Sequence, residues 1–240
     1  MSKFIWFEYV GGDTQQAKNF FGELFGWTTQ AVPMPEGAYE MIASGGRTIG
    51  GYASSKDPAH WLTHLRTTDA KATSEQVVKL GGKIVKPASK VGEFGTMALV
   101  ADPQGGTFAL WQPAKAEDAP PPTTGTFCWN ELASSDPAAS AKFYAAIGGL
   151  TDKPMEMPGM GTYHVLESAY EPRAGIMAKM MPQQPHAWLP YVQVASADKT
   201  SEKAKKLGGT IVVPPTDIPN VGRFSIVVDT QGAAIGILQP

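Results

Sequence analysis

The chain has 240 residues, 42% of them hydrophobic and 18% charged, which is the composition of a folded globular protein rather than of a disordered chain. Its 20 lysines and arginines stand against 22 aspartates and glutamates, and the sequence has no basic run that would neutralise phosphates. We therefore expect no nucleic-acid partner.

The predicted elements of the first half follow the order strand, helix, three strands, and then the same order again. Residues 4–10 alternate and are rich in aromatic and β-branched types, as is typical of a strand. A helix with an apolar stripe follows, capped by Asp13 or Thr14 and ended by Gly26. The later predicted elements are a hairpin (37–44 and 47–54), a fifth strand (61–67), a second helix (70–80) and a last hairpin (95–101 and 107–111).

The second half of the chain repeats the first. The first strand and the aspartate after it align with residues 127–136, which pairs Trp6 with Trp129 and Glu8 with Glu131. Further matches are Leu80-Gly-Gly with Leu207-Gly-Gly and Asp102-Pro-Gln-Gly with Asp229-Thr-Gln-Gly. Because a repeat determines architecture more strongly than local propensity does, we predict two tandem modules at 1–113 and 126–240, joined by a proline-rich linker at 114–125.

The sequence also bears on location. An acidic residue, Glu8, interrupts the N-terminal apolar run too early for the core of a signal peptide, and no apolar stretch approaches the ~20 residues that span a bilayer. The single cysteine, Cys128, has no partner for an internal disulfide, and we interpret it as a small core residue rather than a nucleophile. We expect a cytoplasmic protein without a membrane partner.

These motifs resemble those of a known family. A first strand that ends in Asp, a helix carrying Phe-Phe or Phe-Tyr, and Leu-Phe-Gly-Trp after it are similar to the glyoxalase/bleomycin-resistance/extradiol-dioxygenase (vicinal oxygen chelate, VOC) superfamily. The Leu-Gly-Gly and Asp-Pro-Gln-Gly elements add to the resemblance, which is closest to the tandem two-module bacterial branch. It implies an α+β fold in which each module pairs two βαβββ units into a half-open barrel around a cavity.

The resemblance also implies where metal ligands would stand. The three places are the first strand, the fifth strand and the last strand of each module, and the residues found there are Trp6, Leu62 and Ala109, then Trp129, Leu189 and Gly236. A slip of the alignment would put His64 or Tyr191 at the fifth-strand position instead. Because a catalytic zinc or iron needs about three ligands from histidine and carboxylate, we expect no cofactor; a divalent metal is the alternative.

Alternation along the first strand puts Trp6 and Glu8 on one face, and Trp129 and Glu131 likewise. The glutamates are candidate general bases or anchors for a cationic substrate, or else structural carboxylates held by an arginine or a backbone donor. The two tryptophans are candidates for stacking a flat ligand, or else fill the core.

The fifth strands differ between the modules. His64 and Arg66 share a face in the first module, where the second has Tyr191 and Gln193, so we expect non-equivalent pockets. Glu8 with His64 is a candidate acid/base pair or rudimentary metal site, with a structural histidine as the alternative. The other histidines, in or beside predicted turns and hairpins, are interpreted as surface residues: His60, His164 and His186.

Two functions remain open. The first is a metal-independent, bleomycin-resistance-like protein that binds a small, partly aromatic molecule. The second is a lyase, isomerase or dioxygenase-type VOC enzyme that acts on a glyoxal-like electrophile or an antibiotic, with Glu8 or Glu131 as base. A structural or interaction role is a third possibility. We expect a small-molecule partner and either a monomer or a homodimer.

Overall fold

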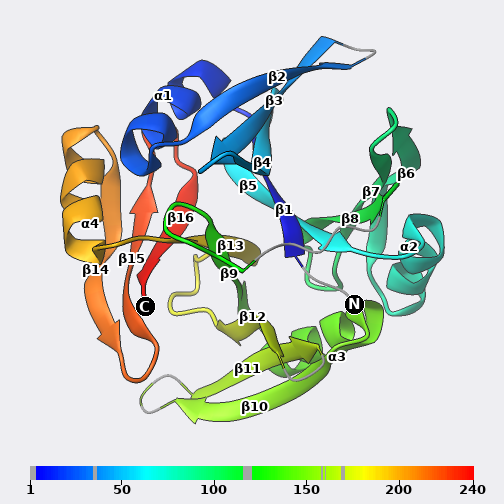
Figure 1. Ribbon diagram of the computed structural model, residues 1–240. Helices are drawn as coiled ribbons and strands as arrows, with labels where there is room; N and C mark the ends of the chain where they lie inside the picture. The colour runs from blue at the N-terminus through cyan, green and yellow to red at the C-terminus, as the bar shows by residue number, and fades with distance from the viewer. Residues whose placement is uncertain (1–3, 35–36, 116–120, 158, 160, 169–170) are drawn as a thin grey trace. The chain divides into compact units, whose positions relative to one another are not determined.

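The computed structural model describes residues 4–34, 37–115, 121–157, 159, 161–168 and 171–240 (Figure 1). Part of the predicted linker, residues 116–120, lies outside the described residues. None of the helices in the described ranges is long and apolar enough to cross a membrane.

The first half of the chain forms the elements that the sequence predicts, in the predicted order. They are β1 (Phe4–Val10), α1 (Thr14–Phe25), β2 (Thr28–Met34), β3 (Gly37–Ser44), β4 (Arg47–Ala53), β5 (His60–Arg66), α2 (Ala70–Lys79), β6 (Lys83–Val91), β7 (Gly95–Ala101) and β8 (Thr107–Pro113). The predicted hairpins and helices agree with these bounds to within a few residues. The sequence predicts no bounds for β2 and β6, because most of their residues are exposed, and apolar and polar side chains do not alternate clearly along them.

The second half repeats this order. Its elements are β9 (Phe127–Ser134), α3 (Pro137–Gly148), β10 (Thr151–Met157), β11 (Gly161–Ser168), β12 (Glu171–Ala178), β13 (Ala187–Gln193), α4 (Ala197–Lys206), β14 (Thr210–Ile218), β15 (Gly222–Val228) and β16 (Ala234–Gln239).

Each half of the chain contributes one eight-stranded sheet. The strand orders are β2-β3-β4-β1-β5-β8-β7-β6 and β10-β11-β12-β9-β13-β16-β15-β14. Within each βαβββ half the last three strands form an antiparallel meander, and the first strand pairs in parallel with the last, as β1 does with β4 and β9 with β12. The prediction of an α+β fold with two tandem modules is confirmed.

The first helix of each module begins and ends where local chemistry requires. The Asp13 carboxylate accepts the backbone N–H groups of Gln15 and Gln16, which would otherwise lack partners, and Gly26 ends the helix at φ 74°. In the second module Asp136 caps α3, and Pro137 stands in the first turn, where a missing N–H costs nothing. The caps therefore fix the residue at which each first helix begins after its strand.

The described residues cluster into two compact units that cut across the modules. Unit 1 takes its described residues from 1–5, 62–119 and 129–188, and unit 2 from 6–61, 120–128 and 189–240. Each unit thus combines one βαβββ half of the first module with one half of the second. The module boundaries predicted from the sequence remain a prediction.

A glutamine in the last hairpin of each module helps to hold each unit together. In unit 1 the Gln104 side chain accepts the backbone N–H of Asp136, at 3.0 Å, and donates to the carbonyl oxygen of the same residue, at 3.0 Å. In unit 2 the Gln231 side chain makes the same two contacts with the backbone of Asp13. The glutamine of the Asp-x-Gln-Gly motif therefore binds the helix cap of the other module, which gives the recurring motif a structural reason.

Each unit has its own core. In unit 1, α2 and α3 bury apolar side chains against β7, β8, β11 and β12, including Val77, Phe108, Tyr144, Leu166 and Trp188. In unit 2, aromatic rings pack edge-on or tilted around Phe21, whose centroid lies 5.8 Å from those of Tyr9 and Trp27 and 5.3 Å from that of Trp61. Trp61 and Trp188 are 6% and 4% exposed, so both belong to the core.

Candidate functional site

The first strands separate a core face from a second face that is partly exposed. On β1 the Phe7 and Tyr9 side chains are buried, whereas Trp6 and Glu8 alternate with them and are intermediate in burial. On β9, Trp129 and Glu131 are likewise intermediate, and the residues that alternate with them, Asn130 and Leu132, are buried. In both modules the tryptophan and the glutamate thus share the face that points away from the first helix.

In unit 2 a tyrosine from β3 joins the two predicted residues. The Trp6 indole Nε1 donates to the Tyr39 hydroxyl oxygen at 3.1 Å, and the Tyr39 hydroxyl donates to Glu8 Oε1 at 2.5 Å. The three side chains therefore form one hydrogen-bonded chain across β1, β4 and β3.

A glycine on β4 makes room for this tyrosine. Gly51 lies directly opposite Glu8 in the parallel β1–β4 pair. A Cβ at Gly51 would collide with the hydroxyl and ring of Tyr39, so only glycine lets the phenol lie across β4 and reach β1.

Unit 1 contains the same arrangement, built from the second module. Trp129 Nε1 donates to the Tyr163 hydroxyl at 3.1 Å, and this hydroxyl donates to Glu131 Oε2 at 2.8 Å. Gly175 lies opposite Glu131, and a Cβ there would collide with the Tyr163 hydroxyl. We call each set of three side chains, Trp6–Tyr39–Glu8 and Trp129–Tyr163–Glu131, a Trp–Tyr–Glu chain.

The chemistry of the indole fixes the direction of each Trp–Tyr–Glu chain. An indole N–H only donates, so the tyrosine oxygen must accept from it and point its own hydrogen at the carboxylate. Burial, then the charge of Glu8 and the hydrogen bond to it, raise the pKa of Tyr39 far above its ordinary value, and the same causes act on Tyr163 through Glu131. Both phenols therefore stay protonated at neutral pH, and the glutamate oxygens that face them are acceptors.

The sequence alone did not single out Tyr39 or Tyr163. Both tyrosines stand on the second strand of the meander, and each has its glycine 12 residues later, Gly51 and Gly175. This paired recurrence was the available signal, but the contact itself depends on a strand order that places β4 between β3 and β1.

The fifth-strand candidates lie in different units from the first-strand residues of their own modules. In unit 1, His64 is 3% exposed and pairs in register with Ala109, and Arg66 ends β5 opposite Trp111. Glu8 belongs to unit 2, so its predicted pairing with His64 stays a prediction.

In unit 2, Tyr191 is buried and pairs in register with Gly236. A Cβ at Gly236 would collide with the Tyr191 ring, so this ring fills the space beside the last strand where the family resemblance implied a metal ligand. Gln193 follows two residues later, and its backbone N–H donates to the Thr126 carbonyl at 2.9 Å.

The side chains at the implied metal positions do not fit a zinc or iron centre. Trp6, Trp129, Ala109 and Gly236 supply no ligand atom of the required kind. Across the described ranges no cluster of three or more His, Cys, Asp or Glu side chains is placed to hold a metal ion. We therefore derive no chemistry through a metal.

The surface interpretation was wrong for two histidines. His164 is 7% exposed, and its Nδ1 lies 2.9 Å from Asp152 Oδ2 on the neighbouring strand β10. The His186 side chain is 6% exposed, and its Nε2 lies 2.7 Å from Asp102 Oδ2. His60, at the start of β5, is intermediate in burial. The predicted turns suggested that these side chains are exposed, but His164 and His186 are each buried in contact with an aspartate.

Asp102 is the centre of a buried polar network in unit 1. Its Oδ1 accepts the backbone N–H groups of Gln104 and Gly106, both at 2.9 Å, and its Oδ2 accepts the Tyr144 hydroxyl at 2.9 Å in addition to His186. Burial raises the pKa of Asp102, but the hydrogen bonds from His186 and from the other donors outweigh it and hold this pKa below its ordinary value. The carboxylate is therefore ionised in the core.

Cys128 is partly buried on β9, and its thiol lies 3.4 Å from the Tyr191 carbonyl oxygen. Burial raises the pKa of this thiol to about 12. A thiol that stays protonated at neutral pH is a poor nucleophile, which agrees with its interpretation as a packing residue.

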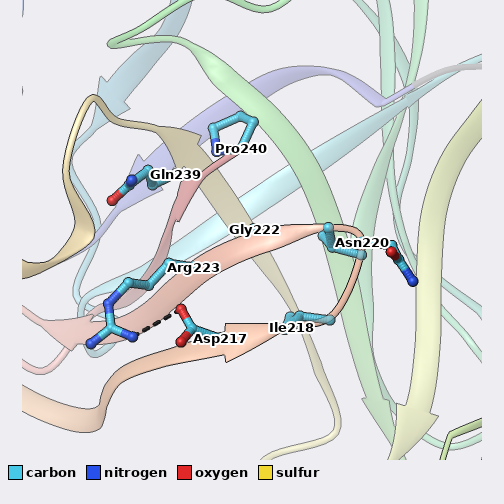
Figure 2. A pocket seen from close by; sticks show the side chains of 8 residues that line it. Asp217, Ile218, Asn220, Gly222, Arg223, Gln239 and Pro240 are labelled. Atoms are coloured by element: carbon cyan, nitrogen blue, oxygen red, sulfur yellow. Dashed lines mark hydrogen bonds and ion pairs between the residues drawn. The ribbon is translucent and has the colours of Figure 1, made fainter.

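A surface hollow of about 510 Å³ lies away from the predicted site residues, at the turn between β14 and β15 (Figure 2). It is lined by Asp217, Ile218, Asn220, Val221, Gly222, Arg223, Gln239 and Pro240. Arg223 is held there by Asp217 and by a two-pronged ion pair with Asp198. The hollow contains none of the residues of either Trp–Tyr–Glu chain.

The fold and these side chains define a class: a tandem βαβββ protein whose first strands carry hydrogen-bonded aromatic and carboxylate side chains in place of a metal donor set. The chain belongs to the Glyoxalase/Bleomycin resistance protein/Dioxygenase superfamily, whose family model matches residues 3–110 and 128–237. The predicted resemblance is confirmed.

Curated relatives align over nearly the whole chain. A Mycobacterium tuberculosis protein named "Putative glyoxylase CFP32" is 35% identical over 98% of this chain and 94% of its own length. The anthracycline biosynthesis protein DnrV of Streptomyces peucetius is 29% identical over 98% of this chain and 92% of its own length.

Solved structures show the same fold. The 2,2',3-trihydroxybiphenyl 1,2-dioxygenase of Sphingomonas wittichii strain RW1 has a TM-score of 0.71 at 12% identity, covering 100% of this chain and 90% of its own. The Mn(II)-bound glyoxalase of Novosphingobium aromaticivorans has a TM-score of 0.69 at 15% identity, covering 100% of this chain and 83% of its own.

Proposed function

We propose that this protein binds a small, partly aromatic molecule against the Trp6 and Trp129 faces of its first strands, without a metal ion. The observation that carries the proposal is the Trp–Tyr–Glu chain, which stands in both modules where the family resemblance implied the first metal ligand. An indole held at its N–H edge offers a fixed flat surface, and small-molecule sites combine such apolar surfaces with a few polar groups.

The names of the relatives support an aromatic ligand. DnrV is described as an anthracycline biosynthesis protein, and the Sphingomonas neighbour as a trihydroxybiphenyl dioxygenase. Both names refer to molecules with flat rings. We therefore take ring systems of this kind as the first probes for this chain.

The test is titration of the purified protein with an anthracycline and with 2,3-dihydroxybiphenyl, followed by calorimetry and by quenching of tryptophan fluorescence. We expect binding by at least one probe, weakened about five-fold or more by Trp6→Ala, by Trp129→Ala or by both, because stacking on an aromatic ring contributes about 1 kcal/mol or more. Phe94→Ala is the matched control, because Phe94 is an exposed aromatic at the β6–β7 turn. Absence of binding by both probes, or equal losses in the control, would contradict the proposal.

The metal-free part of the proposal has its own test. Metal analysis of the protein as purified, and titration before and after treatment with EDTA, should show no stoichiometric metal and unchanged probe affinity. Stoichiometric zinc, iron, nickel or manganese that is needed for binding would overturn it.

An enzymatic role is the second candidate, because each glutamate presents a carboxyl oxygen that accepts a hydrogen bond from a protonated phenol. With Glu8 or Glu131 as base, the protein would be a lyase or isomerase that removes a proton from a glyoxal-like electrophile. Turnover of methylglyoxal with glutathione that disappears in Glu8→Gln or Glu131→Gln would favour this role over simple binding.

We further propose a monomer or a homodimer that acts inside the cytoplasm. Size-exclusion chromatography with light scattering distinguishes the two assemblies, because the monomer has a mass of 25.5 kDa. Fractionation of cells that produce the protein would test the location.

A further inference from the structure

We propose that Tyr39 and Tyr163 are positioning residues: each phenol fixes the first-strand tryptophan and glutamate of its unit in the arrangement that receives the ligand. The inference rests on the proposed function and deepens it, because it names the side chains that hold the binding surface. Neither tyrosine coordinates or reacts with anything in this scheme; each acts through its two neighbours.

The first argument is the connectivity of the phenols. Each hydroxyl accepts one hydrogen bond from an indole and donates one to a carboxylate, at 3.1 and 2.5 Å in unit 2 and at 3.1 and 2.8 Å in unit 1. A hydroxyl used once as acceptor and once as donor holds both neighbours at fixed distances, so that neither turns without breaking a bond.

The second argument is the space in which the phenols lie. Gly51 and Gly175 stand opposite the glutamates, and any larger residue there would push the tyrosine hydroxyl away from the carboxylate. Neither glycine has a positive φ, so backbone strain does not explain its presence. The space for the phenol does.

The third argument is a nearby tyrosine that lacks these contacts. Tyr52 follows Gly51 on β4 and is 4% exposed, and its hydroxyl has no hydrogen-bond partner among the described residues. The same half-sheet thus contains one phenol that links two candidate site residues and one that links none. Tyr52→Phe is therefore a matched control for Tyr39→Phe.

The first experiment uses the indole N–H signals in a ¹⁵N-correlation spectrum of the full chain. Trp6→Phe and Trp129→Phe assign two of the six signals. Tyr39→Phe should shift the Trp6 signal and speed its exchange with solvent, and Tyr163→Phe should do the same for Trp129 alone, whereas Tyr52→Phe should leave both unchanged. A general loss of stability would move all the signals together.

The second experiment titrates the same variants with the anthracycline and 2,3-dihydroxybiphenyl. Tyr39→Phe and Tyr163→Phe should each weaken the probe at its own site about five- to ten-fold, the range that corresponds to one lost hydrogen bond. Gly51→Ala and Gly175→Ala should reproduce these losses, and Tyr52→Phe should bind as the unmodified protein does.

The outcomes separate this inference from the proposed function. If the indole signals shift but probe affinity does not change, or if neither signal shifts, the positioning role is wrong while binding at Trp6 and Trp129 stands. If the unmodified protein binds neither probe, the proposed function fails, and the positioning role fails with it.

Discussion

The substitution Asp102→Asn tests whether the buried network of unit 1 stabilises the protein through the charge of one carboxylate. The new amide keeps an oxygen for the two backbone N–H groups but presents an NH₂ group to the Tyr144 hydroxyl and the His186 Nε2 atom. Two hydrogen bonds to a charged acceptor, at 2.9 and 2.7 Å, are thus replaced by donor–donor contacts. Each such bond contributes about 1.5–3 kcal/mol, so we expect a loss of about 3 kcal/mol after the tyrosine hydroxyl has rotated to accept from the amide.

The His186 ring cannot relieve the remaining contact cheaply. Its Nε2 would accept from the new amide only if the proton moved to Nδ1, and Nδ1 is buried without a hydrogen-bond partner among the described residues. A buried donor without a partner costs about 1–3 kcal/mol, so the tautomer change recovers little. The imidazole thus adds to the cost of the substitution.

Urea unfolding at pH 7 and calorimetry give the measurement. A loss of about 3 kcal/mol corresponds to a fall in melting temperature of about 6–12 °C for a chain of this size. The matched control is Asp229→Asn in unit 2, where the carboxylate accepts the Tyr9 hydroxyl at 2.8 Å and no imidazole from the described residues, so its loss should be about half as large. Equal losses in the two variants, or a loss below about 1 kcal/mol for Asp102→Asn, would refute the reasoning.

Three further predictions follow from the same structure. The folded-state pKa of Asp102 lies below its ordinary value of 3.8, so the stabilisation from its ionised form is present above about pH 4 and is lost as the pH falls through the folded value. The substitution Asp102→Asn should therefore flatten the acid side of a curve of unfolding free energy against pH. The Cys128 thiol, with its pKa raised to about 12, should react slowly with a disulfide reagent at pH 7.5 and faster in urea, and fast labelling of the native protein would contradict its burial. A protease site inserted in the 114–125 linker should allow cleavage of the chain while the two modules stay associated, because each compact unit contains residues of both modules. Two separate fragments in native size-exclusion chromatography would contradict this division into units.

The sequence predicts the fold well because the repeat duplicates every element in order. Strand alternation also places Trp6 and Glu8 on one face, which depends only on the two-residue period of a strand. The same reasoning could not find Tyr39, which is 31 residues from Glu8 in the chain. Their contact requires the register of three strands and a glycine between them, and neither follows from a local pattern.

The error for His186 has the same origin, whereas the partner of His164 lies only 12 residues away, on the neighbouring strand. His186 is 84 residues from Asp102 and comes from the other module, so nothing near it in the sequence indicates a buried partner. The interleaved units are also invisible in the repeat, because a repeat shows which segments are alike and not which of them pack together. Long-range pairing therefore sets the limit of what the sequence predicts here.

The two modules satisfy their buried hairpin aspartates with donors from different elements. Both hairpin aspartates, Asp102 and Asp229, are buried and accept a tyrosine hydroxyl, but the donors are not equivalent: Tyr144 comes from α3 and Tyr9 from β1. A buried carboxylate needs a donor, and the two units supply it from different elements.

The Trp–Tyr–Glu chain behaves differently from these aspartates. Tryptophan, tyrosine, glutamate and the spacing glycine all stand at equivalent places in the two modules, with the same direction of hydrogen bonding. The aspartates show that a buried acceptor can be satisfied by donors from different elements, whereas here the same three side chains and one glycine recur on a face that is only partly buried. Duplication alone does not separate a structural from a binding requirement, because the hairpin glutamines Gln104 and Gln231 are duplicated for a structural reason. The titrations of the Tyr39→Phe and Tyr163→Phe variants separate the two requirements, because only a binding surface loses affinity for the probe when its geometry is released.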